Sequence, residues 1–508
     1  MTKIRIESYL LAIIGAFLVF VSGCSEDFFN EKAGDRITPD KHYRTSIDFE
    51  ISAYGALLPL QDVMPKFIIL DGLRSDIMDV TPYADAHLNE INEHIISEVN
   101  PFTNPADFYK VIININELLA NIDKIAERDR FFDEYVTYFA KGALISMRAW
   151  VYFTLVRLYG EAAYIEDNMT SLPGVFIDTT DMLDKDVMID TLINQLTPYI
   201  YEDYPSDVQY AELKLPYYVN TKALLGEMYL EINDYVNAVL YLKLACESYL
   251  NQNSLLKVDA TYRDLAWGGI HLNAESQELE NLSVIPYNSS EGQYNQLANW
   301  TYYQYKVKPT QILIDSFNSQ PAADGTVGDP YRSMFTVYED TLSGNAVITK
   351  YILDEQDPFS SDIIISRAAD IHLLLAEAYN RIGTVEAQYY ALMLLNQGAN
   401  AENPKPAEYA KWSRNIGIRG RVYLASREVP EGLGGEGLTL LIEDYIMAER
   451  AMELAYEGKR WFDLVRVAER RGKPEYLADI VAEKFKGTPK YVEVRTRMLD
   501  KENWYLSY

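Results

Sequence analysis

The stretch AERAMELAYEGKRWFDLVRV, residues 448–467, combines an apolar stripe with regularly spaced charges. Small and apolar residues recur every three or four positions, the spacing of one helix face, and they are Ala451, Ala455, Gly458, Phe462 and Val465. Charged residues follow at intervals of three, a separation at which opposite charges pair across adjoining turns; they are Glu457, Arg460, Asp463 and Arg466. The stretch therefore predicts a scaffold element with a buried face and no direct contact with ligand.

Two further segments, 107–125 and 138–159, carry apolar residues at the same helical spacing. The stripe of the first segment consists of Phe108, Ile112, Ile115, Leu119 and Ile122. The stripe of the second consists of Gly142, Ile145, Ala149, Phe153 and Val156. Such stripes predict two long helices packed as an antiparallel pair. Residues 48–60 show the same period and predict a surface helix.

A helix-pair repeat is the clearest internal signal of the sequence. Its first copy consists of Leu225, Gly226 and Tyr229 on one helix and Ala238, Leu242 and Ala245 on the next. Its second copy consists of Leu375, Ala376 and Tyr379, then Ala391, Leu395 and Gly398. The spacing resembles a tetratricopeptide repeat, although Lys222 and Leu250 depart from its consensus. Because each repeat leaves an apolar face that only a neighbour covers, we expect a mainly α fold with a stacked, tetratricopeptide-like scaffold.

Loops interrupt this scaffold in one long stretch. Residues 252–365 break the helical period and hold turn signals such as Trp267-Gly268-Gly269 and Asp324-Gly325. We expect an irregular insertion there, within a single domain spanning 41–508. Loops carried on a rigid scaffold are where binding residues concentrate, so the insertion is the expected place for ligand contacts.

The first residues indicate export rather than fold. Lys3 and Arg5 precede an apolar run at 9–21, which is too short to cross a bilayer. The run ends in Val-Ser-Gly-Cys, which resembles a bacterial lipobox and predicts a signal peptide at 1–23, lipidation of Cys24 and a tether at 24–40. An ordinary signal peptide with a chance cysteine is the alternative. Two or three acyl chains hold a protein firmly on a bilayer.

The composition limits the classes of partner. A formal charge of −29, without a run of lysines and arginines, argues against nucleic acid and anionic lipid as ligands. Aromatic residues make up 13% of the chain, and its forty tyrosines suit a surface that stacks on and hydrogen-bonds to sugars or peptides. Cys246 has no partner for a disulfide and is expected in the core.

Four stretches together resemble the SusD/RagB family. The stretch at 448–467 matches its ERxxELxxEGxRWFDLxR segment at Glu449, Arg450, Glu453, Leu454, Glu457, Gly458, Arg460, Trp461, Phe462, Asp463, Leu464 and Arg466. The others are MRAWVYFTLVRLYG at 147–160, SRAADIHLLLAEAYNRIG at 366–383, and DPYR at 329–332 before ITKYI at 348–352. The resemblance implies a SusD-like helical fold, a surface lipoprotein of the outer membrane, and a complex with a SusC-like TonB-dependent transporter. It implies ligand contacts in variable loops, for which the family offers no motif.

Aromatic residues of the insertion are the first candidates for ligand contact. Trp267, Trp300, Tyr302 and Tyr303 have rings on which a pyranose or a peptide side chain can stack. In an extended segment, Trp300 and Tyr302 would point the same way. The alternative is that one or two of these rings are buried against the helical body.

Residues 71–80, DGLRSDIMDV, give a second set of candidates. Arg74 and Asp76, followed by Tyr83, combine a guanidinium, a carboxylate and a ring, which suit hydrogen bonds to sugar hydroxyls. The stretch also resembles an LRSD segment of the family. A structural salt bridge is therefore the alternative interpretation of Arg74 and Asp76.

The sequence holds no clear sign of an enzyme. It has no GxSxG elbow, phosphate-binding glycine loop, HExxH motif or cysteine pair. His87, Glu90 and His94 would share a helix face and could hold a metal, but no third strong ligand accompanies the two histidines. We expect no catalytic residues, no metal and no cofactor; no stretch has the ligand spacing of an EF-hand.

The leading hypothesis is a glycan-binding surface lipoprotein that captures oligosaccharides and delivers them to a TonB-dependent outer-membrane transporter. One alternative is an oligopeptide-binding, RagB-like lipoprotein. A second is a purely structural protein associated with the transporter, which predicts that the loop aromatics are buried.

Overall fold

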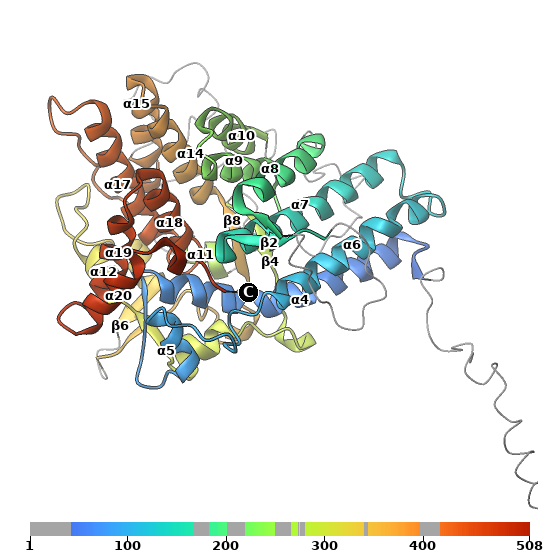
Figure 1. Cartoon of the computed structure of the whole chain (residues 1–508), viewed down its shortest axis with the longest axis horizontal. Coiled ribbons are helices and arrows are strands. Elements are labelled where there is room, and N and C mark those ends of the chain that lie inside the picture. The colour runs from blue at the N-terminus through green and yellow to red at the C-terminus, as the bar shows by residue number, and fades with distance from the viewer. Residues whose placement is uncertain are drawn as a thin grey trace, which may run out of the picture. The chain divides into compact units, whose positions relative to one another are not determined.

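A computed structural model describes residues 42–165, 182–200, 219–248, 266–272, 274, 280–339, 344–396 and 417–507. The predicted signal peptide, Cys24 and the tether lie outside the described residues. Residues from Thr45 onward form one unit, built mainly of helices (Figure 1). Where the chain is described, its strands pair only as two-stranded antiparallel sheets. The prediction of a mainly α fold is confirmed.

Three long helices open this unit, and they are α4 (Ser46–Arg74), α6 (Ala106–Ala126) and α7 (Glu134–Tyr159). Thr45 begins α4 with a capping box that it forms with Asp48. The helix continues through Pro59 and Pro65, and most of its second half is buried. The prediction of a surface helix over 48–60 was therefore too short. The predicted helix pair is confirmed, because α6 packs on α7, and α4 covers α6 (Figure 1).

Two helix pairs occupy the positions of the predicted repeats: α9 (Thr221–Glu231) with α10 (Tyr235–Ser248), and α14 (Ala368–Ile382) with α15 (Val385–Leu395). A Cβ atom at Gly226 would lie 2.4 Å from Cγ of Leu242, so only glycine permits this approach of α9 to α10. Tyr229 stacks on Tyr241 at a ring distance of 5.3 Å.

The two pairs stack on one another, as predicted. Helix α10 packs against α14, and α14 packs against α17 (Gly435–Glu453). Their facing side chains form one continuous apolar cluster, with Leu242, Leu374 and Leu394 among its fully buried members. Cys246 is buried in the same cluster, as expected. Gly398 lies outside the described residues.

The remaining elements are shorter. The helices are α5 (Ala86–Asn92), α8 (Lys185–Leu196), α11 (Ala266–Leu272), α12 (Gln311–Asn318), α13 (Pro330–Thr336), α16 (Ile418–Arg421), α18 (Arg460–Arg471), α19 (Pro474–Ala482) and α20 (Lys490–Met498). The strand pairs are β1 (Met78–Val80) with β5 (Val307–Pro309), β2 (Glu161–Ala163) with β3 (Met182–Asp184), β4 (Asn281–Ile285) with β8 (Ile363–Arg367), and β6 (Val337–Glu339) with β7 (Ala346–Ile348). Most described elements of the insertion have eight residues or fewer, in keeping with the predicted loop-rich stretch.

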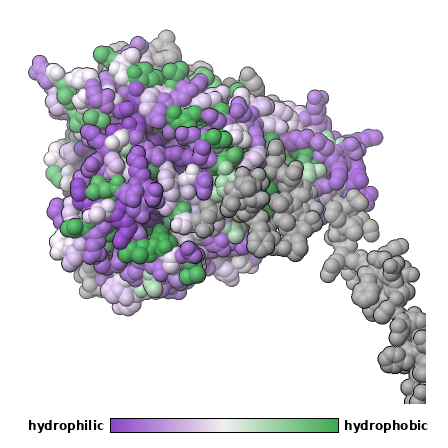
Figure 2. Space-filling model, in the orientation of Figure 1, coloured by the Kyte–Doolittle hydropathy of each residue, from purple (hydrophilic) through white to green (hydrophobic). Residues whose placement is uncertain are grey.

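None of the described helices combines the length and apolar character needed to cross a bilayer. Figure 2 shows hydrophilic side chains over much of one face, with smaller apolar patches between them.

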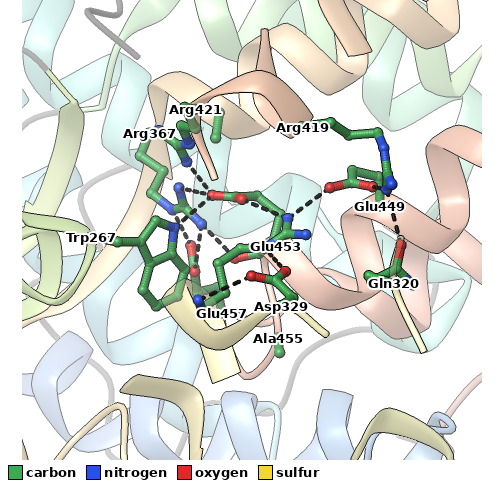
Figure 3. A network of polar contacts seen from close by, with 12 residues as sticks. Trp267, Gln320, Asp329, Arg367, Arg419, Arg421, Glu449, Glu453, Ala455 and Glu457 are labelled. Carbon is green, nitrogen blue, oxygen red and sulfur yellow. Dashed lines mark hydrogen bonds and ion pairs between the residues drawn. The ribbon is translucent and has the colours of Figure 1, made fainter. Parts of the chain in front are cut away.

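The charged residues of 448–467 form a buried ionic network rather than surface pairs (Figure 3). Glu453 accepts hydrogen bonds from Arg332 at 3.0 Å, from Arg367 at 2.8 Å and from Arg421. Its carboxylate has no exposed surface, so the three guanidinium groups replace the water that it lacks.

Neighbouring acids of the motif hold further basic side chains. Glu449 accepts from Arg332 and Arg419, each at 2.7 Å. Glu457 accepts from Lys350 at 2.7 Å and from Arg367 at 2.8 Å. These ion pairs join α17 and the turn after it to α13, β8 and α16.

The expected pairing across adjoining turns holds for one pair only. Asp463 and Arg466 lie three residues apart and are separated by 2.8 Å. Arg460 instead binds Asp76, and Glu457 binds residues far away in the sequence. Pairing with distant residues has a physical cause. These side chains point into the interior of the protein, where a buried charge is stable only beside buried partners of opposite charge.

We expect removal of one network charge to destabilise the whole unit. Glu453→Gln would leave three buried guanidinium groups short of a counter-charge, which costs about 3–5 kcal/mol of the free energy of unfolding. Chemical denaturation measures this loss. Glu436→Gln is the control, because that side chain is 70% exposed and should change stability by less than about 0.5 kcal/mol. Equal losses in the two variants would contradict the assignment.

Acid should destabilise the fold through Glu457 of this network and through Glu377, a second buried carboxylate, which pairs with Arg466 and Arg470. Burial would raise the pKa of Glu377 and Glu457, but the facing guanidinium groups of Arg466 and Arg367 outweigh burial and lower each pKa to about 2. Because both pKa values lie below those of the unfolded chain, their stabilisation is present above about pH 4.5 and is lost as the pH falls toward 2. Tm measured from pH 7 to pH 3 should fall; a constant Tm would contradict the network.

Candidate functional site

Exposed aromatic rings gather on the insertion around a π-helical turn at Asn299–Tyr303. Thr301 is buried, and its hydroxyl donates to the carbonyl of Leu297, four residues earlier in the same segment, at 2.8 Å. The side chains beside it point outward, since Tyr302 is 48% exposed and Tyr303 is 56% exposed. The segment is therefore not extended, and the same-side placement of Trp300 and Tyr302 that an extended segment would give does not apply. Wide turns of this kind often occur at functional sites.

Four rings form a connected surface, which we call the aromatic surface: Tyr294, Tyr302, Tyr303 and Phe359. Tyr303 stacks on Phe359 with ring centres 5.6 Å apart and planes inclined by 16°. Tyr294 meets the same Phe359 edge-on at 6.2 Å, and Tyr302 meets Tyr303 edge-on at 5.3 Å. The three tyrosines are each about half exposed, so the cluster presents rings and phenol hydroxyls to solvent.

Further rings lie on adjoining segments. Trp300 is half-buried and packs against Phe102 at a ring distance of 5.3 Å. Tyr83 is 70% exposed and lies 6.5 Å from the ring of Tyr305. The backbone joins these segments, because Thr81 N–H donates to the carbonyl of Lys306 at 2.9 Å. Tyr83 and Trp300 thus remain accessible to a ligand, in whole or in part.

Hydrogen bonds between loops hold the aromatic surface in place. Asn295 is fully buried; its N–H donates to the carbonyl of Phe359 at 2.8 Å, and its side-chain amide donates to the carbonyl of Ser361 at 2.7 Å. The hydroxyl of Ser289 donates to Asp357 at 2.7 Å. The loops before Tyr294 and around Phe359 are therefore fixed to each other. Rings fixed before binding lose little conformational freedom when a ligand arrives.

Trp267 is not part of this surface, which corrects its prediction as a ligand contact. Its side chain is 2% exposed, and its indole N–H donates to Glu453 at 3.3 Å. Figure 3 shows the indole beside Arg367 and Glu457 in the ionic network. The ring is buried because it supplies an N–H to the network and fills the space next to it.

Arg74 and Asp76 are also inside the body, which corrects their prediction as ligand contacts. Arg74 is 1% exposed; it donates to the carbonyl of Trp504 at 2.7 Å and lies over the ring of Trp461 at 4.0 Å. Asp76 accepts two hydrogen bonds from Arg460, at 2.7 and 2.9 Å. The alternative interpretation, a structural salt bridge, describes Asp76 correctly.

Sequence reasoning did not select Tyr294, Phe359 or Phe102. Each of the three stands in a loop beside polar residues or proline, and Phe359 follows Pro358 in a turn rich in Asp and Ser. An aromatic residue in such a polar turn has little apolar sequence around it to bury it. The polar sequence around each ring could therefore have indicated an exposed aromatic residue.

The histidine pair does not share a helix face. Helix α5 ends at Asn92, and His94 follows it with a left-handed φ of 56°. Its imidazole is buried against Trp461, and burial lowers the pKa of His94 well below its ordinary value. Within the described ranges, no cluster of three His, Cys, Asp or Glu side chains is placed to hold a metal ion.

Comparison with known proteins covers nearly the whole chain. Residues 297–507 match the sequence profile of the SusD family. The SusD-like protein P2 of Formosa agariphila is 21% identical to this chain, and the alignment covers 91% of each of the two chains. A solved SusD superfamily protein from Bacteroides vulgatus superposes with a TM-score of 0.66 at 17% identity, covering 91% of this chain and 95% of the other.

A solved structure described as a laminarin binding SusD-like protein superposes with a TM-score of 0.59 at 18% identity. It covers 87% of this chain and 95% of the other. The matched profile includes the stretch at 448–467 and the π-helical turn. Residues 297–507 thus match the SusD family profile, and 91% of the chain is similar in fold to a solved SusD superfamily protein.

Proposed function

We propose that this chain is a glycan-binding protein that captures oligosaccharides on the aromatic surface and passes them to a SusC-like TonB-dependent transporter. In this proposal, acyl chains on Cys24 hold it on the outside of the outer membrane. The chain contributes binding and no catalytic step.

The observation that carries the proposal is the exposure of several rings held in one ordered surface. Exposed aromatic residues gathered in one place mark a binding site more often than single ones do. The face of a tyrosine ring accepts the C–H groups of a pyranose, and its hydroxyl bonds to sugar hydroxyls. Tyr302 and Tyr303 present both features at once.

The purely structural alternative predicts that the loop aromatics are buried. Trp267 fits that description, but Tyr302, Tyr303 and Tyr83 do not. Capture of a soluble ligand accounts better for these exposed rings. The fold similarity to a laminarin binding protein supports a glycan rather than a peptide as that ligand.

The proposals of delivery to a transporter and of a lipid anchor rest on the sequence and on the similarity to the SusD family. The stretch Val-Ser-Gly-Cys at 21–24 supports the anchor. An anchored protein stays close to a membrane-embedded partner, so captured ligand has a short distance to travel.

Loss of one ring should weaken glycan binding. We expect Tyr303→Ala to raise the Kd by about tenfold, because a stacked ring contributes on the order of 1 kcal/mol or more to a contact. The measurement is calorimetric titration of the full-length chain, in a zwitterionic detergent, with a panel of plant, host and microbial oligosaccharides and a peptide digest.

Tyr389→Ala is the matched control, because this tyrosine is 40% exposed on α15, within the repeat scaffold. It should leave the Kd unchanged. Binding of peptides alone would replace the glycan assignment by the oligopeptide alternative. Failure of every ligand to bind would support the structural role.

A further inference from the structure

Three segments carry the rings of the site and its neighbours: 81–103, 286–306 and 352–362, all of them described in full. Their combined sequence contains one lysine, Lys306, and no arginine. That lysine forms an ion pair with Asp85 at 2.9 Å. The positive charge nearest to the rings in these segments is therefore already matched by a carboxylate.

Negative charge is abundant on the same segments. The acidic residues are Asp85, Glu90, Glu93, Glu98, Glu291, Asp354, Glu355, Asp357 and Asp362. Glu291, Asp354 and Glu355 are exposed. They lie on the two loops that hold the aromatic surface, close in sequence to Tyr294 and Phe359.

One of these carboxylates, Asp357, belongs to the hydrogen bonds that hold the aromatic surface in place. It adjoins the turn Pro358–Ser360, which carries Phe359, and accepts hydrogen bonds from the hydroxyls of Ser360 at 2.5 Å and Ser289 at 2.7 Å. These hydrogen bonds lower the pKa of Asp357, so the carboxylate is ionised at neutral pH. A negative charge is thus built into the loop that supports the rings.

A ligand on the aromatic surface would lie in this negative field. Like charges within about 8–10 Å repel one another at physiological salt, and added salt screens the repulsion. The carboxylates of these segments would repel a carboxylate or sulfate group on the sugar. The three segments offer no unpaired lysine or arginine that could bind such a group. Neutral sugars would meet no such repulsion, and their hydroxyls would still have acceptors to bond.

We propose that the aromatic surface selects uncharged glycans and discriminates against glycans that carry uronate or sulfate groups. This inference rests on the proposed function and specifies its substrate class. Glu291, Asp354 and Glu355 are the residues that set the discrimination, because they are acidic, exposed and placed on the loops of the rings.

The test uses two ligands that differ at C6: a neutral β-glucan oligosaccharide, and the same oligosaccharide with its C6 hydroxymethyl groups oxidised to carboxylates. Calorimetric titration of the full-length chain at low salt should give a Kd at least about tenfold higher for the carboxylated ligand. The ratio should shrink in 0.5 M NaCl, roughly a 4 Å screening length. The Kd of the neutral ligand should not change with salt.

The triple variant Glu291→Gln, Asp354→Asn and Glu355→Gln should bring the two Kd values together while preserving the Kd for the neutral ligand. Circular dichroism checks that this variant folds, and Glu436→Gln, which removes an exposed charge on α17, is the control that should keep the full ratio. Equal or tighter binding of the carboxylated ligand by the unaltered chain overturns this inference and leaves glycan capture intact. Failure of both ligands and of the wider glycan panel overturns the inference together with the proposed function.

Discussion

The structure depends on buried ion pairs that three glutamates make with basic side chains from distant segments. Glu449, Glu453 and Glu457 follow one another at intervals of four and line one side of α17 and the turn after it. Each buried carboxylate is tolerated only when its guanidinium or ammonium partners are present, because an unpaired charge inside a protein is costly. The network consequently favours one arrangement of α13, β8 and α16 around α17, and it does so with directional hydrogen bonds rather than with apolar contact alone.

This network also explains where the candidate site lies. Arg332 and Lys350, both within the insertion, are held by Glu449, Glu453 and Glu457, so the insertion is fixed to the helical body at two points. The loops that carry the rings are joined to one another by further hydrogen bonds through Asn295 and Ser289. Irregular backbone can therefore present exposed rings in a fixed arrangement, and its outer residues can vary without disturbing the core.

The sequence predicted the parts of the fold that depend on local pattern. Helical periodicity located α6, α7 and both repeat pairs, and the stretch at 448–467 resembles the family whose profile matches residues 297–507. Prediction from the sequence failed for side chains whose burial depends on partners far away in the chain. Trp267 and Asp76 look like surface residues until Glu453 and Arg460 are brought beside them, and no local period reports such contacts. Phe359 was missed for the opposite reason, since only the folded loops bring it against Tyr303.

The central claim is that the aromatic surface is where a glycan binds. A crystal structure of the protein with a neutral oligosaccharide from the binding panel tests it most directly. The account predicts density for a sugar ring against Tyr302 or Tyr303, with sugar hydroxyls bonded to groups of the surrounding loops. Density for the sugar at another place on the protein, with the aromatic surface empty, would contradict it.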